Sequence, residues 1–213
     1  MCDWGSVTDW ISAITNVVLV GMAFYGFRAW KSEFRAQKRF EIASRAIEAF
    51  SKADEALAYC RSRFVAGGEG RTTLDRCLTE FTEIEDPLAD DQRTSMLVPA
   101  AVLERLDSAS VREDFTALDE VRHQTAVILG PEAKSAVEAL LKQRQAVFNT
   151  AHIYLKSMIE DYRPYVKGRD ANIDQMRATM IELDEEDAIV ARVRKARADL
   201  ERITEPILRI ATG

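Results

Sequence analysis

The feature that most constrains the fold of this chain is an uncharged segment close to its N-terminus. Between Asp9 and Arg28 lie 18 residues without a charge, WISAITNVVLVGMAFYGF. A helix of this length spans about 27 Å, close to the hydrocarbon thickness of a bilayer, about 30 Å. Trp10 at one end, and Tyr25 and Trp30 at the other, are aromatic residues of the kind found at membrane interfaces. The segment therefore predicts a transmembrane span, with the apolar residues Trp10, Ile11, Val17, Val18, Leu19, Val20, Met22, Phe24 and Phe27.

Basic residues flank this segment on one side only. Residues 1–27 contain no Lys or Arg, whereas a basic group follows directly, formed by Arg28, Lys31, Arg35, Lys38 and Arg39. The positive-inside rule then predicts a single-pass membrane protein with its N-terminus outside and its C-terminal part in the cytoplasm. A cleaved signal peptide carries its positive charge before the apolar run, so we expect the segment to remain as an anchor.

Two other interpretations of the segment stay open at this point. A buried helix of a soluble bundle normally shows a polar stripe, but residues 17–27 are apolar on all faces. A helix lying flat on a membrane needs a basic polar face, which the segment lacks. Small residues such as Gly21 and Gly26, together with the polar Asn16, would allow copies of the span to associate.

The rest of the chain has the pattern of an all-α protein. Apolar residues recur at steps of three and four, as in Ala43, Ala46, Phe50, Ala53 and Leu57, which is one face of a helix. We expect long helices at about 9–64, 111–129, 131–162 and 185–210, and short ones at 74–83, 99–106 and 170–183. The predicted architecture is an N-terminal transmembrane anchor, residues 1–31, continuing into an antiparallel up-down helical bundle, residues 32–213.

Local signals predict the connections between these helices. The glycine-rich stretch 67–73 (GGEGRTT) is expected to be a helix-ending loop, and residues 83–95 an exposed acidic loop. Pro99 is expected near the first position of its helix and Ser110 at a helix N-cap. The acids at 184–187 favour a helix start. Residues 59–63 and 192–197 are basic clusters, and the second, on a helix with Asp199 and Glu201, favours a solvated, salt-bridged face.

The composition of the chain argues against nucleic-acid binding and against most metal and catalytic sites. The net charge is −6 and the pI about 5.2, so we expect no nucleic-acid partner. Glu120 and His123 form a Glu-x-x-His motif of the kind used in di-iron bundles, but the other histidine, His152, has Asn149 at the matching position. Cys60 and Cys77 are expected to be buried thiols. No catalytic group or cofactor is predicted.

Several segments of the chain are similar to segments of a known group of proteins. The stretches DWISAI and FRAWK near the N-terminus are followed by YCRSRFVAGGEGR, ILGPEAKSAVEALL and DEEDAIVARVRKARADLERITEPIL. In this layout the chain resembles a group of uncharacterised bacterial proteins with one N-terminal membrane helix and a helical cytoplasmic domain. The resemblance implies an inner-membrane setting and the same architecture, and it implies no activity.

We therefore expect a membrane-anchored helical interaction module, acting as an adaptor, a regulator or a self-associating scaffold. Its expected partners are the lipid bilayer and either another copy of the chain or an unknown protein. One alternative is an effector whose transmembrane helices oligomerise and permeabilise the membrane. A second alternative is a metal-binding bundle that uses Glu120, His123 and His152.

Overall fold

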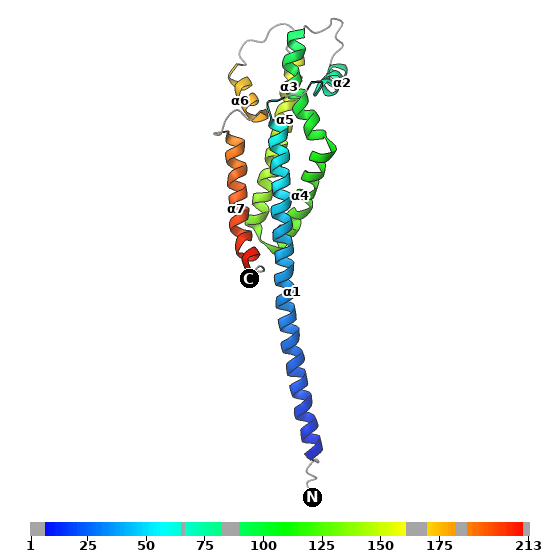
Figure 1. Ribbon diagram of the computed structural model, residues 1–213, viewed down its shortest axis with the longest axis vertical. Coiled ribbons are helices and arrows are strands. Elements are labelled where there is room, and N and C mark those ends of the chain that lie inside the picture. The colour runs from blue at the N-terminus through cyan, green and yellow to red at the C-terminus, as the bar shows by residue number, and fades with distance from the viewer. Residues whose placement is uncertain (1–6, 65–66, 82–89, 161–169, 182–186, 211–213) are drawn as a thin grey trace. The chain divides into compact units, whose positions relative to one another are not determined.

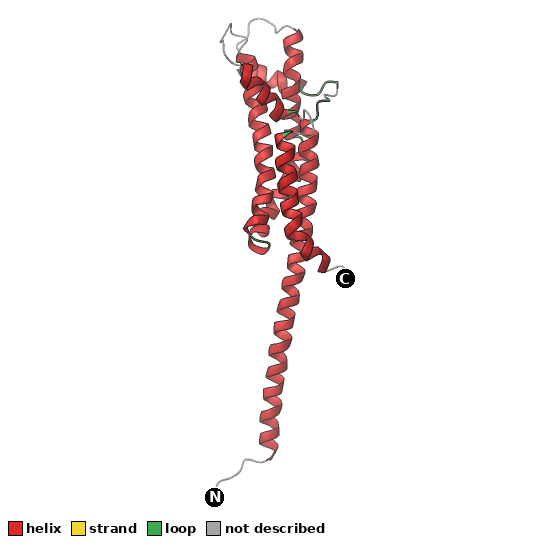
Figure 2. Ribbon diagram, turned by 90° about the vertical axis from the view of Figure 1, so that its left-hand side faces the viewer, coloured by secondary structure: helices red, strands yellow, loops and turns green. Residues whose placement is uncertain are grey.

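The chain is all-helical wherever its structure is described. The computed structural model describes residues 7–64, 67–81, 90–160, 170–181 and 187–210, and these ranges contain no strand (Figure 2). The helices, in chain order, are α1 (Val7–Arg61), α2 (Arg71–Phe81), α3 (Asp90–Asp107), α4 (Ala109–Ile128), α5 (Pro131–Glu160), α6 (Asp170–Met180) and α7 (Ala188–Ile210) (Figure 1). The predicted fold class, all-α, is confirmed.

The chain divides into two compact units, residues 1–41 and residues 42–213. α1 contributes to both, because it runs from Val7 to Arg61. The predicted boundary after residue 31 separates a membrane segment from a cytoplasmic one, which is a different division, and it stays a prediction.

In the second unit, residues 42–61 of α1 bury the face that the sequence pattern indicates. Ala43, Ala46, Phe50, Ala53 and Leu57 are all buried. Their spacing places them on one stripe of the helix, and Phe50, Ala53 and Leu57 belong to the main hydrophobic core.

α5 packs against most of the other helices in the second unit: α2, α3, α4, α6 and α7 all contact it. α4 and α5 form an antiparallel pair around Gly130, whose φ of 109° is left-handed and suits glycine. The Arg144 guanidinium on α5 lies 5.0 Å from the centre of the Phe115 ring on α4. These two residues are almost equally far from Gly130 along the chain, which is the register of a helical hairpin.

The structure corrects the expectation for residues 83–95 and for Pro99. α3 begins at Asp90, so residues 90–95 are helical, and Pro99 lies inside the helix instead of near its first position. Residues 83–89 lie outside the described residues. Proline costs about 3 kcal/mol in a helix interior, but Met96, Ala100 and Val102 are buried around it. Tertiary packing therefore outweighs the local preference.

The N-cap of α4 is also different from the prediction. Ser108 occupies this position, not Ser110, and its side chain makes no capping hydrogen bond. The Ser108 hydroxyl instead donates to the Arg105 carbonyl oxygen at the end of α3, at 2.7 Å. Ser108 therefore joins α3 to α4 with a one-residue connection, and Ser110 lies in the first turn of α4.

Candidate functional site

The predicted transmembrane span lies in the first part of α1 and is uncovered. Each of its nine apolar residues has a relative exposure between 51% and 72%. A core helix of a soluble bundle buries such side chains, and this segment of α1 does not. Among the described residues, α1 is the one helix that is long and apolar enough to cross a membrane.

The polar groups of the span are few. The Thr15 hydroxyl donates to the Ile11 carbonyl oxygen at 2.8 Å, which satisfies it within the helix. Asn16 is exposed, and its amide has no hydrogen-bond partner in the described part of the chain. It is therefore available to a neighbouring molecule.

Aromatic rings and cations follow the span directly. Phe27 and Trp30 have ring centroids 5.9 Å apart, and Trp30 and Phe34 have theirs 5.8 Å apart, so the three rings form a ladder along α1. Of the basic group, Lys38 pairs with Glu41 at 2.8 Å on the surface. The other four cations (Arg28, Lys31, Arg35 and Arg39) are exposed and make no ion pair with any described residue.

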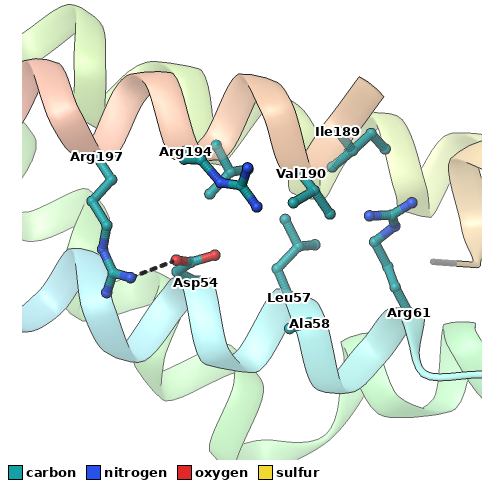
Figure 3. A pocket seen from close by; sticks show the side chains of 9 residues that line it. Asp54, Leu57, Ala58, Arg61, Ile189, Val190, Arg194 and Arg197 are labelled. Carbon is teal, nitrogen blue, oxygen red and sulfur yellow. Dashed lines mark ion pairs between the residues drawn. The ribbon is translucent and has the colours of Figure 1, made fainter. Parts of the chain in front are cut away.

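In the second unit, a groove of about 250 Å³ lies between α1 and α7 (Figure 3). Leu57 of α1, with Val190 and Val193 of α7, forms its apolar wall. The Arg197 guanidinium closes one side, because it contacts Asp54 at 3.4 Å and donates to the Ser51 hydroxyl at 2.8 Å. The lining also includes the charged residues Asp54, Arg61, Arg194 and Arg197, so the groove combines apolar and charged side chains.

Near one end of this groove lies a buried ion pair between Arg61 and Asp187. The Arg61 side chain is 2% exposed and that of Asp187 is 3% exposed, and a guanidinium nitrogen donates to the carboxylate. Arg61 also donates to three carbonyl oxygens at the end of α6 and just beyond it: those of Ala178 (3.0 Å), Thr179 (3.1 Å) and Ile181 (3.3 Å). One side chain of α1 thereby ties the end of α6 to the start of α7.

The carboxylate of Asp187 has a second role as the N-cap of α7. Its Oδ1 accepts the backbone N–H of Ile189 at 2.7 Å and that of Val190 at 3.3 Å. Burial by itself would raise the pKa of Asp187. The hydrogen bonds from Arg61 and from the two backbone N–H groups outweigh burial and hold this pKa below its ordinary value.

A second buried arginine, Arg105 of α3, holds the end of α1. It donates to both carboxylate oxygens of Glu69, at 2.6 and 2.7 Å, and to the carbonyl oxygens of Ser62 (2.8 Å) and Phe64. Its guanidinium carbon lies 5.2 Å from the centre of the Tyr59 ring. The hydrogen bond with Glu69 is the main reason that the pKa of Arg105 is raised.

The glycine-rich stretch makes this second cluster possible. It follows the end of α1, as predicted, and residues 67–70 form a turn that carries Glu69 to Arg105. Residues 71–73, which the sequence predicts to be part of the loop, are instead the first residues of α2. Gly70 has a φ of 80°, and a Cβ there would lie 2.7 Å from both the Ala101 nitrogen and the Leu97 oxygen of α3. Only glycine fits a backbone with this φ and this approach.

Sequence reasoning missed both buried arginines. From the sequence, Arg61 is recognised only as part of the basic cluster at residues 59–63, and Arg105 has no predicted role. One signal is shared by both: each lies in the last turn of its helix, a position from which an arginine can bind free carbonyl groups. The long-range partners of Arg61 and Arg105 have no local signature.

The structure does not bring the proposed metal ligands together. Glu120, His123 and His152 are all exposed. His123 lies seven residues before Gly130 and His152 lies 22 residues after it, so in the α4–α5 hairpin they are about 20 Å apart along the helix axis. The described residues contain no group of three or more His, Cys, Asp or Glu side chains able to hold a metal ion.

Cys60 and Cys77 are buried, as the sequence predicts. Burial raises the pKa of Cys60 to about 12, although the nearby cations Arg105 and Arg144 act in the opposite direction. Burial also raises the pKa of Cys77. Neither thiol is therefore prepared to act as a nucleophile at neutral pH.

Comparison of the chain with protein-family models, with curated proteins and with solved structures finds no match. The resemblance to uncharacterised bacterial membrane proteins therefore stays a prediction.

Proposed function

We propose that this chain is a membrane-anchored helical interaction module. Residues 10–27 cross the bacterial inner membrane once, with the N-terminus outside, and the remainder lies in the cytoplasm. There the helices form an antiparallel up-down bundle that binds a protein partner or another copy of the chain. The observation that carries the proposal is the apolar segment of α1, which no described part of the chain covers.

Water is a poor environment for this segment, and a bilayer is a good one. Its large side chains point in all directions around the helix, so one contact with a partner could not bury them all. The five cations that follow it, against none before it, favour the orientation with the C-terminal side in the cytoplasm.

Two helix pairs support the antiparallel bundle. Arg61 pairs with Asp187 and Asp54 with Arg197, so successive contacts move down α1 as they move up α7. α4 and α5 form the hairpin around Gly130. Short connections between neighbouring helices are typical of up-down bundles.

The outer face of α5 supports an interaction role. Phe148 and Ile153 are exposed, and the Phe148 ring stacks on that of His152 with their planes 8° apart. Exposed aromatic and aliphatic side chains of this kind are enriched at protein interfaces. Phe148 and Ile153 are therefore candidate contact residues of the second unit.

The anchor is tested by Val20→Arg, with Val127→Arg as the matched control. Both valines are exposed, at 69% and 86%, but Val20 lies in the span and Val127 in α4. An arginine near the centre of a span costs about 3 kcal/mol of insertion free energy, roughly a hundredfold. We expect Val20→Arg to leave the membrane fraction and Val127→Arg to stay in it. Equal membrane fractions for the two variants would refute the anchor.

The orientation is tested with a C-terminal reporter that is active only outside the cytoplasm. We expect no activity from the intact chain. Replacing Arg28, Lys31 and Arg35 with Gln should produce activity in part of the population, because the orientation signal is weakened. A reporter that is active on the intact chain would overturn the proposed topology.

The interaction is tested by a tagged pull-down of the full chain from mildly solubilised membranes, read by mass spectrometry. A stoichiometric protein partner or a discrete oligomer is expected. The double variant Phe148→Ser/Ile153→Ser should reduce its recovery, whereas Val127→Ser should not. Recovery of a single monomeric chain, with or without crosslinking, would contradict the proposal.

The second candidate function, a permeabilising effector, is favoured by one observation. The Asn16 amide is exposed within an apolar segment and has no partner in the described chain. In a membrane such an amide favours association with another copy. If the spans assemble into a pore, overexpression should depolarise cells and Asn16→Leu should relieve this effect. An unaffected membrane potential would remove this candidate.

A further inference from the structure

The basic group after the span lies on one face of α1. At 3.6 residues per turn, the positions of Arg28, Lys31, Arg35, Lys38 and Arg39 fall within about 100° of the helix circumference. We call these residues the basic stripe. Glu33, the acid within the same segment, lies nearly opposite the centre of the stripe. The charges are therefore sorted by face as well as by position along the chain.

This sorting is more than an orientation signal requires. The positive-inside rule depends on the number of cations near the end of a span and not on the face that they occupy. Cations that served only this purpose would be scattered around the helix. Their confinement to one face indicates a surface that they contact together.

The aromatic ladder lies beside the basic stripe. Phe27, Trp30 and Phe34 occupy the adjoining sector of the helix and are more than half exposed. Aromatic rings next to cations are suited to the boundary between acyl chains and headgroups. A helix that leans toward this combined face brings rings and cations to the bilayer surface and turns Glu33 away from it.

The length of the stripe supports a leaning helix. Arg28 and Arg39 are about 16 Å apart along the axis, and headgroups add only about 5–7 Å to each side of the hydrocarbon core. On an upright helix Lys38 and Arg39 would lie beyond the headgroups and near the limit of electrostatic reach, about 8 Å at physiological salt. On a helix that leans toward the stripe, all five cations reach the headgroups.

We propose that the basic stripe binds the acidic phospholipid headgroups of the cytoplasmic leaflet, with Phe27, Trp30 and Phe34 seated at the acyl boundary beside it. Four of the five cations have no ion-pair partner among the described residues, and the pair between Lys38 and Glu41 is exposed on the surface. Phosphate groups are the anions that a bilayer supplies at this depth. The inference rests on the proposed function, because it needs the span to be in the membrane.

The test uses the full chain with Trp4→Phe and Trp10→Phe, which leaves Trp30 as the single tryptophan. The chain is reconstituted into vesicles that are purely zwitterionic or about one-third acidic phospholipid. A quencher is attached to the headgroup of either the acidic or the zwitterionic lipid. A cation near an acidic surface is worth about a fivefold change in occupancy, so Trp30 should be quenched severalfold more by the acidic lipid. This preference should fall at 1 M salt, where screening acts within about 3 Å.

A matched variant separates the face of the charges from their number. Exchanging Arg35 with Ala36 and Gln37 with Lys38 keeps the composition and net charge but spreads the cations around the helix. We expect this variant to insert normally and to lose most of the preference for acidic lipid. If the preference is unchanged in the variant, or is absent from the parent chain, the inference is wrong while the anchor stands. If neither protein floats with either kind of vesicle, the anchor itself is refuted, and the lipid site with it.

Discussion

Removing the guanidinium of Arg61 should destabilise the second unit more than any surface charge change. In Arg61→Met the Asp187 carboxylate keeps its burial but loses its cation, and three carbonyl oxygens around the end of α6 lose a donor. Breaking a buried ion pair by removing one partner costs about 3–5 kcal/mol. We expect the free energy of unfolding to fall by about that amount.

The assay is urea unfolding of the full chain in detergent, followed by far-ultraviolet circular dichroism. Arg202→Met is the matched control, because Arg202 lies on α7 and pairs with Asp199 at 2.9 Å on the surface. An exposed pair contributes about 0–1 kcal/mol, so this variant should unfold close to the parent. If Arg61→Met unfolds at the same urea concentration as Arg202→Met, the reasoning is refuted.

A double-mutant cycle adds a sharper measurement. Asp187→Asn keeps an oxygen able to cap α7 but removes the negative charge, so by itself it leaves Arg61 without a counter-ion. Once Arg61→Met is present, the same change removes an unpaired buried charge and should cost much less. We expect a coupling free energy of about 1–3 kcal/mol between the two positions. Additive effects would show that the two side chains do not interact.

The pH dependence follows from the lowered pKa of Asp187. A carboxyl group whose pKa is lower in the folded state than in the unfolded state adds stability above the unfolded value, about 3.9. That contribution is lost as the pH falls through the lower, folded value. The parent should therefore lose stability below about pH 4 more steeply than Asp187→Asn. Parallel profiles for the two proteins would contradict the assignment.

Two further predictions concern the glycine turn and the thiols. Gly70→Ala should destabilise the protein by several kcal/mol, because the new Cβ would lie 2.7 Å from backbone atoms of α3. Gly68→Ala, with a φ of 101° and no atom within 4 Å of the new Cβ, should cost only about 1 kcal/mol of backbone strain. Equal midpoints of the two variants in urea would refute the close approach at Gly70. In a chain that carries Cys2→Ser, Cys60 and Cys77 should resist alkylation at pH 8 until urea unfolds the second unit, because burial raises the pKa of both thiols. Rapid labelling of the folded chain, read by mass spectrometry, would contradict their burial.

Much of the helical framework could be predicted because periodicity reports burial directly. The apolar stripe through Phe50 and Leu57 marks the buried face of α1, and glycine and proline at 130 and 131 mark the turn between α4 and α5. The apolar segment at residues 10–27 is equally apparent from the sequence, because a run without charges can be recognised without knowledge of what it contacts. These signals are local, so one sequence is enough to read them.

The errors arise where distant residues decide the local structure. Pro99 has the local signature of a helix start, but α3 continues through it because Met96 and Val102 are held in the core. Arg61 belongs to a local basic cluster, but its partner Asp187 lies 126 residues away along the chain. Neither outcome can be inferred from a window of a few residues, because the deciding contacts are tertiary.

The two buried arginines perform the same task in different places, and this explains why they are arginines. A helix leaves its last four carbonyl oxygens without intrahelical donors. At the end of α1 Arg105 donates to the Tyr59 carbonyl oxygen at 3.3 Å, and at the end of α6 Arg61 donates to that of Thr179 at 3.1 Å. The planar guanidinium, with five donors, can bind several carbonyl oxygens and one carboxylate together, which a lysine ammonium cannot match in geometry.

Each arginine is also neutralised by one acid. Glu69, in the turn before α2, neutralises Arg105, and Asp187, at the start of α7, neutralises Arg61. Because an unpaired buried charge is so unfavourable, each pair penalises any packing that separates its helices. The arginines therefore select one alignment of α1, α3, α6 and α7, a specificity that the apolar core, which tolerates small sliding of helices, does not provide alone.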